Sequence, residues 1–277
     1  MPIHNAGAAL AHSVERLLAQ ALADTEIIVV DDASTDGSVD ALVDRPNTRV
    51  RSIRLHENGG PAAARNAGAR AASSPWLMFL DGDDHLLPGA LEQFLQSIPD
   101  AHDGLVRAGV HWHLDDGAIA EVEAFTPGSF VVRADLFWAV GGYDPELRFG
   151  ENSDLIERLE RRIRESGGTI AHLEQATVLA SSFAESRDYN RARMESAIHL
   201  LERDAARLNA NPRRRSRYEM IAAVNATRVG EYGPARVHAW RSVRAEPKRL
   251  SNYARLALVC SGPFGRWYWT RNDRVAS

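Results

Sequence analysis

The chain has 277 residues, enough for one large domain or for one domain with an appendage. Its composition, with 44% hydrophobic and 25% charged residues, is typical of a soluble globular protein. A single cysteine, Cys260, excludes an intrachain disulfide bond and a cysteine-based metal site. The apolar runs are far shorter than a membrane span, and the first ten residues lack the pattern of a signal peptide, so we expect a cytoplasmic protein.

The net charge of −4 conceals an asymmetry between two parts of the chain. Residues 1–185 carry 14 arginines against 29 acidic residues, a formal charge of −15, whereas residues 186–277 carry 19 basic against 8 acidic residues, a charge of +11. Such an asymmetry indicates two regions with different partners. The basic region either docks on the acidic one or faces an anionic membrane or polymer, and the sequence leaves both interpretations open.

The first hundred residues alternate between helix and strand patterns. Apolar residues recur at helical spacing over residues 8–22, and a short buried strand at 26–30 ends at the pair Asp31-Asp32. The elements expected next are a short helix over 38–43, a strand over 49–55, an alanine-rich helix beginning at Pro61, a strand over 76–80 and a helix after Pro88. This alternation predicts an α/β layered sheet.

The second half of the chain changes character. A half-exposed strand is expected over 105–114, followed by a strand, a helix and a Gly-Gly turn, and then by a charged helix after residue 151. After residue 185 the strand patterns stop, and only apolar stripes at helical spacing remain. We therefore expect an α/β domain over 1–185 and a basic helical region over 186–277.

Three carboxylates follow the apolar run 76–80 at one point of the chain: Asp81, Asp83 and Asp84. Ligands bind at strand ends in open α/β sheets, because the loops diverge there and leave a crevice. Clustered carboxylates repel one another unless a cation neutralises them, and their hard oxygen atoms suit Mg²⁺ or Mn²⁺. Taken alone, so short and common a pattern favours helix capping or an ordinary turn.

Four stretches of sequence follow one another along the chain in this order: IIVVDDASTDGS, NGGPAAARNAGARAA, WLMFLDGDDHLLPGAL and VGGYDPELRFGENSDL. Together they resemble the inverting family-2 glycosyltransferases of the GT-A fold, over residues 2–160. The resemblance implies a mostly parallel mixed sheet between helices in a catalytic domain over 1–185, followed by a C-terminal α-helical extension. It also implies a nucleotide-diphospho-sugar donor, with UDP expected before dTDP or GDP, and a carbohydrate or lipid-linked acceptor rather than a nucleic acid.

The same resemblance assigns roles to individual residues. The nucleotide-binding set comprises His4, Asp31, Asp32, Arg65 and Asp81. Within it, the two adjacent aspartates match those that meet the nucleobase and the ribose. The D-x-D pair of the family corresponds to Asp81 and Asp83, and Asp83 is the better ligand for Mn²⁺ or Mg²⁺.

The acceptor hydroxyl is a poor nucleophile, so a carboxylate must take its proton. In the family, the motif Gly-Glu-Asp follows a loop on the acceptor side. That loop corresponds here to Gly142, Tyr143 and Asp144. This chain instead reads Gly150-Glu151-Asn152, and an amide cannot accept a proton at neutral pH. Glu151 and Asp154 are therefore the candidate catalytic bases, and we favour Glu151 because Asp154 can act as a favourable charge at a helix start.

The departure at Asn152 also supports an alternative function. The chain could be an inactive GT-A-like module that binds a nucleotide and recruits a partner through its helical tail.

Residues 176–186 lack the histidine that often lies near the metal in the family, so the ion would depend on Asp83, phosphate oxygens and water.

The start of the chain departs from the family as well. Family members open with a full β-strand before Pro-x-[Tyr/His]-Asn, whereas this sequence opens at Met1-Pro2-Ile3-His4-Asn5. We therefore expect the first strand to be missing and one edge of the sheet to be unpaired. A start codon further upstream is our preferred explanation.

The stretch PFGRWYWTRNDR at 263–274 interleaves aromatic residues with Arg266 and Arg271. Amphipathic rings among basic residues suit a membrane interface, so peripheral contact with an anionic membrane is one hypothesis. The commoner outcome for such a stretch is that Trp267, Tyr268 and Trp269 pack the last helix against the catalytic domain.

Overall fold

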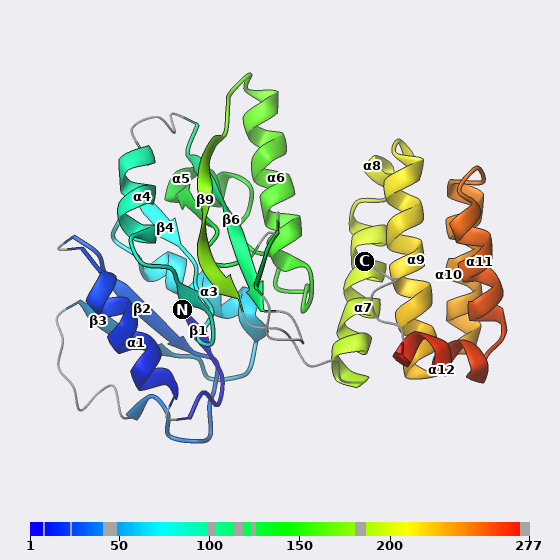
Figure 1. Cartoon of the computed structure of the whole chain (residues 1–277), viewed down its shortest axis with the longest axis horizontal. Helices are drawn as coiled ribbons and strands as arrows, with labels where there is room; N and C mark the ends of the chain where they lie inside the picture. Colours follow the sequence, from blue (N-terminus) through cyan, green and yellow to red (C-terminus); the bar gives the residue numbers. More distant parts are fainter. Residues whose placement is uncertain are drawn as a thin grey trace. The chain divides into compact units, whose positions relative to one another are not determined.

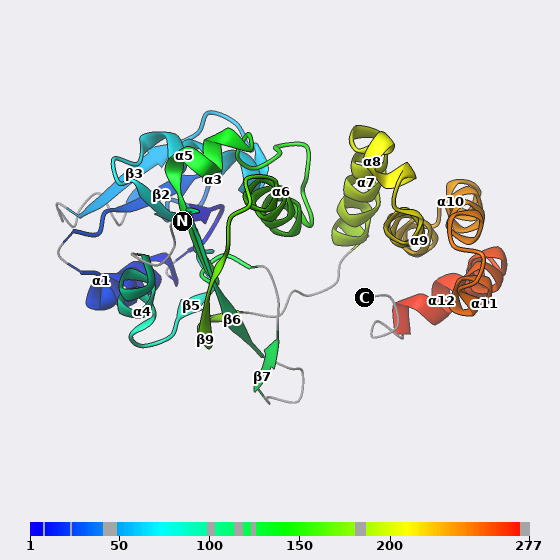
Figure 2. The ribbon, with the colours of Figure 1, turned by 90° about the horizontal axis from the view of Figure 1, so that it is seen from above.

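The computed structural model describes these residues of the chain: 1–7, 9–22, 24–40, 49–98, 103–113, 119–122, 126–180 and 187–271. The chain divides into two compact units (Figures 1 and 2). The first unit comprises Met1–Pro145 and Glu151–Phe183, and the second comprises Glu146–Gly150 and Ala184–Ser277. The boundary predicted at 185/186 lies outside the described residues, as do residues 41–43 of the helix predicted over 38–43.

The first unit contains a three-stranded parallel sheet in the order β1-β2-β3. In this sheet β1 (Pro2–Ile3) pairs with β2 (Ile27–Asp31), and β2 pairs with β3 (Val50–Arg54). The β-branched residues of β2 are almost all buried, in agreement with the uninterrupted apolar run that predicted this strand.

Two residues of the first strand, which we expected to be missing, are present as β1. Pro2–Ile3 lie opposite Val30–Asp31 in parallel register, and the N–H of Asp32 donates to the carbonyl oxygen of Ile3 at 2.8 Å. Because buried backbone groups need hydrogen-bond partners, even a two-residue strand forms where it satisfies those of its neighbour.

A six-stranded mixed sheet follows, with the path β4-β8-β6-β9-β5 and with β7 paired to β6. Its strands are β4 (Trp76–Met78), β5 (His85–Leu86), β6 (Leu105–His113), β7 (Ile119–Val122), β8 (Phe130–Arg133) and β9 (Ala171–Ala180). The pair β6–β9 is parallel, and the other described pairs of this sheet are antiparallel. The predicted mixed α/β architecture is confirmed. The described strands are not mostly parallel as expected, because three of the described pairs are parallel and four are antiparallel.

Helices cover both faces of these strands (Figure 2). On one side, α3 (Gly60–Ala71), α5 (Ala134–Ala139) and α6 (Glu151–Glu165) share an apolar cluster with β4, β6 and β8. On the other side, α1 (Ala9–Gln20) packs on β2, and α4 (Ala90–Ser97) packs near β6 and β9. The two layers of helices place the strand ends, and the loops that follow them, at the surface of the unit.

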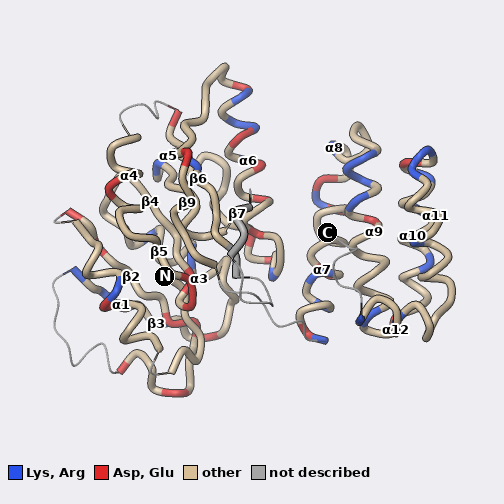
Figure 3. The backbone as a smooth tube through the Cα atoms, in the orientation of Figure 1, with Lys and Arg blue, Asp and Glu red and all other residues tan. Residues whose placement is uncertain are grey.

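The second unit is helical. Its helices are α7 (Arg187–Arg203), α8 (Ala205–Asn209), α9 (Pro212–Val229), α10 (Tyr232–Ala245), α11 (Leu250–Cys260) and α12 (Pro263–Arg271). Nearly every residue in the second half of α9 is buried, so this helix forms the centre around which the others pack. Basic residues are distributed over several helices of this unit (Figure 3). No helix in the described ranges is long and apolar enough to cross a membrane.

The aromatic residues of α12 divide between the core and the surface. Trp269 is fully buried within the helical unit, where its carbonyl oxygen accepts a hydrogen bond from the buried Arg228 of α9 at 3.1 Å. Trp267 is 48% exposed and stacks on Phe264, which is 57% exposed, with 5.5 Å between the ring centroids. The helix is therefore packed by one aromatic residue and presents two others to solvent.

Candidate active site

The turn Asp81-Gly82-Asp83 leaves the end of the apolar run that contains β4. Ser13 of α1 donates its hydroxyl to the carbonyl oxygen of Gly82 at 2.7 Å. A Cβ atom at Gly82 would lie 3.2 Å from the side chain of Ile3 in β1, so a larger residue would crowd that contact. The turn is thus held against β1 and α1, with Asp83 exposed and Asp84 buried.

Arg65 of α3 connects this turn to the candidate base. Its side chain is 2% exposed, and its guanidinium donates to Asp81 Oδ1 at 2.6 Å and to Glu151 Oε1 at 2.8 Å. It also lies over the ring of Tyr143, 5.2 Å from the centroid. Burial acts to lower the pKa of Arg65, but the charge of Asp81 and its other neighbours outweighs this effect and raises the pKa. The site therefore holds a permanent buried cation between two carboxylates.

Glu151 is the first residue of α6 and is 8% exposed. Asn152 donates its amide N–H to Glu151 Oε1 at 3.2 Å, and the Tyr143 hydroxyl donates to Asn152 Oδ1 at 3.0 Å. Burial raises the pKa of Tyr143, which keeps its hydroxyl protonated as a donor. The amide is thus satisfied as both donor and acceptor, and an aspartate at 152 would set a second carboxylate beside Glu151.

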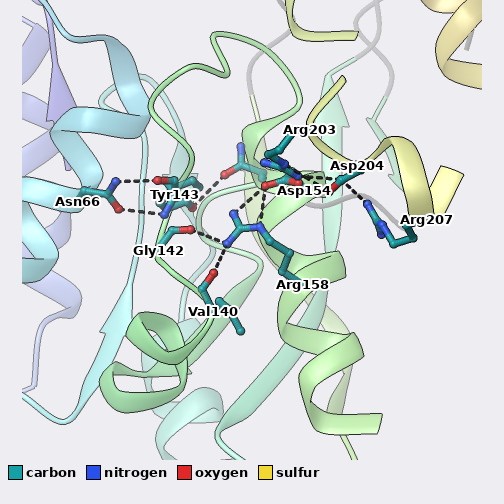
Figure 4. Close-up of polar contacts among 10 residues, drawn as sticks. Asn66, Val140, Gly142, Tyr143, Asp154, Arg158, Arg203, Asp204 and Arg207 are labelled. Atoms are coloured by element: carbon teal, nitrogen blue, oxygen red, sulfur yellow. Dashed lines mark hydrogen bonds and ion pairs between the residues drawn. The ribbon is translucent and has the colours of Figure 1, made fainter. Parts of the chain in front are cut away.

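Asp154 has a different environment from Glu151. It is 2% exposed, and Arg158, one helical turn later, donates Nε to Asp154 Oδ2 at 2.8 Å. The same guanidinium donates to the carbonyl oxygens of Val140 and Gly142 at 2.8 and 2.7 Å (Figure 4). Asp154 therefore orients an arginine that fixes the Gly-Gly turn, and this arrangement favours Glu151 as the base.

The predicted acceptor-side loop is fixed by Asn66 of α3 (Figure 4). Asn66 accepts from the backbone N–H of Tyr143 at 2.9 Å and donates to the carbonyl oxygen of Tyr143 at 2.8 Å. Gly142 has a positive φ of 68°, and a Cβ there would lie 2.8 Å from Asn66 Oδ1. The ring of Tyr143 is 1% exposed and belongs to the apolar core, whereas Asp144 is half-buried. An acceptor could therefore reach Asp144 but not the Tyr143 ring.

The residues predicted to meet the nucleotide lie at the ends of β1 and β2. Asp31 is 1% exposed, accepts from the backbone N–H of Ser34 at 2.8 Å and pairs with Arg54 Nε at 3.3 Å. The carboxylate of Asp32 accepts from the N–H groups of Gly59 and Gly60, each at 2.8 Å, at the start of α3. Both aspartates thus order the loops around the predicted nucleotide site.

His4 lies beside this pair. Its Nδ1 is 2.8 Å from the carbonyl oxygen of Asp32, and its side chain is exposed. The structure therefore groups the predicted site residues into two sets: His4 with Asp31 and Asp32, and Arg65 with Asp81 and Glu151.

The donor set can be tested for a metal. No group of three or more histidine, cysteine, aspartate or glutamate side chains suited to a metal occurs in the described part of the chain. Asp81 and Asp83 nevertheless offer hard carboxylate oxygens in a single turn, and Mg²⁺ is commonly held by one or two carboxylates together with substrate phosphates. The residues present fit an ion that is bound jointly with a diphosphate.

A cavity of about 200 Å³ in the first unit shares Arg65 with the candidate site. It is lined by residues of β2, α3 and β4, including Val30, Arg65 and Leu77. Neither Asp83 nor Glu151 lines it, so the candidate metal ligand and the candidate base lie outside this cavity.

Sequence reasoning missed two residues that build the site, Asn66 and Arg158. Arg158 could have been recognised, because it follows Asp154 at the i,i+4 spacing of a helical ion pair. Asn66 gave no local signal, since its partner Tyr143 is 77 residues away.

An α/β unit that gathers aspartates and a D-x-D turn at its strand ends, with a candidate base at the start of α6 linked to that turn by Arg65, has the features of the GT-A class of fold. The sequence comparison agrees with this assignment. The chain belongs to glycosyl transferase family 2, whose family model matches residues 1–139.

The succinoglycan biosynthesis protein ExoO of Rhizobium meliloti is a relative with 38% identity over 93 residues. The match covers 34% of this chain and 27% of ExoO, so the chain spans about a quarter of that relative's length.

Two solved structures share the fold. TarS of S. aureus, in complex with UDP-GlcNAc, has a TM-score of 0.63 and 16% identity, covering 99% of this chain and 90% of TarS. GalNAc-T7, solved with UDP, GalNAc and Mn²⁺, has a TM-score of 0.54 and 18% identity, covering 69% of this chain and 46% of GalNAc-T7. At these identities the likeness concerns the fold.

Proposed function

We propose that the chain is a metal-dependent inverting glycosyltransferase that moves a sugar from a nucleotide-diphospho-sugar to an acceptor hydroxyl. The observation that carries this proposal is the buried Arg65, which joins Asp81 of the D-x-D turn to Glu151. It links the place for a leaving diphosphate to the only candidate base that is not engaged in fixing the Gly-Gly turn. The expected products are polysaccharide, glycolipid or other cell-surface glycan, in line with the role in the name of ExoO.

On the donor side, Asp83 and Asp81 would hold Mn²⁺ or Mg²⁺ together with the diphosphate. When bound, the ion acts as a Lewis acid that stabilises the charge developing on the leaving group. Arg65 holds Asp81 in place through its ion pair with Asp81 Oδ1 at 2.6 Å. We assign His4, Asp31 and Asp32 to the nucleoside, because they lie together at the ends of the two adjacent strands β1 and β2.

On the acceptor side, Glu151 accepts the proton of the hydroxyl as the oxygen attacks the anomeric carbon. The bond from that carbon to the diphosphate breaks, and the nucleoside diphosphate leaves with the electron pair. A single displacement inverts the configuration of the sugar. Asn152 and Arg65 orient the carboxylate, and Gly142 and Asp144 lie on the loop that would face the acceptor.

UDP is the first donor nucleotide to test. TarS and GalNAc-T7 were solved with UDP-containing ligands, and the second also with Mn²⁺. The test is release of UDP from UDP-GlcNAc, UDP-glucose and UDP-galactose with and without Mn²⁺, with dTDP- and GDP-sugars in parallel. Metal-dependent release that is lost in Glu151→Gln and Asp83→Asn would support the proposal.

A second candidate function is the inactive nucleotide-binding module with a partner-recruiting tail. It is favoured by Asn152, which stands where the family has its usual aspartate base. This alternative predicts metal-dependent binding of a nucleotide diphosphate without release from any donor. It also predicts that Glu151→Gln leaves that binding unchanged.

We also propose peripheral contact of the helical unit with an anionic membrane. Phe264 and Trp267 present stacked, exposed rings on α12, and Arg271 lies over the Trp267 ring at 5.0 Å from its centroid. Cosedimentation with vesicles of anionic and of zwitterionic lipid tests the idea, with Phe264→Ala/Trp267→Ala as the variant. Equal cosedimentation of the protein with both lipids would contradict the proposed contact with an anionic membrane.

A further inference from the structure

The five-residue segment Glu146–Gly150 directly precedes α6, yet by its contacts it groups with the helical unit. Its aromatic residue, Phe149, is half-buried and contacts α7. Only Gly150 separates Phe149 from Glu151 in the chain. The last residue fixed by the helical unit is therefore two positions from the candidate base.

Three residues of α7 hold Phe149. The ring of Tyr189 meets the Phe149 ring edge to face, with centroids 5.3 Å apart and planes at 83°. The guanidinium of Arg193 lies 4.7 Å from the Phe149 centroid, at a distance typical of a cation–π contact. The hydroxyl of Ser196, which is 3% exposed, accepts the backbone N–H of Phe149 at 3.2 Å.

These three contacts come from a single helical face. Positions 189, 193 and 196 follow the i, i+4, i+7 spacing that places side chains one above another on a helix. The Arg193 guanidinium also lies 5.6 Å from the Tyr189 ring, so it contacts both aromatic rings. Ring, cation and hydroxyl together fix both the side chain and the backbone of Phe149.

The chain between Phe149 and Glu151 transmits this constraint. Two trans peptide units span at most about 7 Å, so the anchored position of Phe149 limits where the first residue of α6 can lie. Gly150 adopts a positive φ of 76°, a conformation that L side chains rarely adopt. At the other end, the Glu151 carboxylate is bound by Arg65 and Asn152.

We propose that Phe149, held by Tyr189, Arg193 and Ser196, is a positioning residue for Glu151. This inference rests on the proposed function, in which Glu151 is the base. The helical unit then contributes to turnover through the backbone at 149–151, because a small displacement of a reacting carboxylate lowers the rate steeply. Donor binding by the D-x-D turn does not depend on this anchor.

The test compares variants of the full chain in Mn²⁺-dependent UDP release from the donor that the wild type uses. Phe149→Ala is expected to lower kcat about 10- to 100-fold, while KM for the donor and the Kd for UDP with Mn²⁺ change less than about twofold. Phe149→Tyr retains the ring and should restore kcat. Tyr218→Ala is the matched control, since it removes another arginine–aromatic contact of the helical unit, with Arg214 at 6.0 Å.

A folded Phe149→Ala protein with kcat within twofold of wild type overturns the inference, as does an equal loss in Tyr218→Ala. If Phe149→Ala does not fold, Ser196→Ala and Arg193→Met loosen the same anchor, and an unchanged kcat in both overturns it equally. Failure of the proposed function is distinguishable. In that case the wild type releases no UDP, or Glu151→Gln remains active, whereas failure of the anchor alone leaves Glu151→Gln inactive.

Discussion

Substitution of Arg65 by methionine removes the cation that joins Asp81 to Glu151 while preserving much of the side-chain volume. Two carboxylates then remain near each other without their shared partner. The variant should be destabilised in the first unit, and metal-dependent UDP binding should weaken because Asp81 is no longer oriented.

The magnitude follows from burial. Removing one partner of a buried ion pair costs about 3–5 kcal/mol, because the remaining charge stays buried. Glu151 is 8% exposed, but the side chain of Asp81 is 20% exposed and is partly reached by water, so we expect the lower end, about 3 kcal/mol. Arg65→Lys keeps a positive charge, but a lysine ammonium group cannot bind both carboxylates as the planar guanidinium does. This variant should therefore lose about half as much free energy of unfolding as Arg65→Met.

Hydrogen exchange of peptides from α3 and α6 measures the stability of the first unit separately from that of the helical unit. Arg107→Met is the control, since Arg107 pairs with Glu160 at 2.6 Å and Glu160 keeps Arg164 at 3.4 Å. Its expected cost is about 1 kcal/mol. If Arg65→Met destabilises the unit no more than Arg107→Met does, the central role of Arg65 is refuted.

Three further substitutions probe the groups around Glu151, and urea unfolding of the first unit measures each. Asn152→Asp replaces a donor to Glu151 by a second carboxylate and should cost about 1–3 kcal/mol at pH 8; an unchanged stability would contradict donation from the Asn152 amide to the Glu151 carboxylate. Gly142→Ala must adopt a φ of 68° and crowd Asn66, so it should cost about 1–3 kcal/mol, and an unaffected variant would show that the turn can relax. Burial raises the pKa of Tyr143 above its ordinary value of 10.0. The contribution of the protonated Tyr143 hydroxyl to the free energy of unfolding is therefore complete below pH 10 and falls as the pH rises further. The advantage of wild type over Tyr143→Phe should therefore shrink above pH 10, by about 1.4 kcal/mol per pH unit, and a constant difference would refute the burial of a protonated hydroxyl.

Local patterns predicted the early part of the fold well. The apolar run at 26–30 and the break at Pro61 marked β2 and α3, because burial and proline geometry act over a few residues. The cluster of aspartates at the end of the β4 run was predicted from the same kind of local pattern. Two residues of the first strand could not be predicted, since their pairing depends on β2 and not on their own composition.

The connections within the site are not local. Arg65 meets Glu151 across 86 residues of sequence, and no periodic pattern signals such a contact. Tyr143 follows a Gly-Gly turn and therefore resembled a surface loop residue, but its ring completes the core beside Phe79. The grouping of Phe149 with the helical unit was equally inaccessible, because the aromatic and hydroxyl partners lie on a helix that begins 38 residues later.

The most direct test of the central claim is thermal stability with UDP, GDP, dTDP and CDP, each with and without Mn²⁺, on wild type and Asp83→Asn. A ligand at 100 times its Kd adds about 2.7 kcal/mol, a readily measured shift. We predict that one nucleotide diphosphate, UDP first, stabilises the wild type only with Mn²⁺ and that Asp83→Asn abolishes the effect. Stabilisation by none of the four, or equal stabilisation of the variant, would contradict the assignment of the D-x-D turn as the diphosphate site.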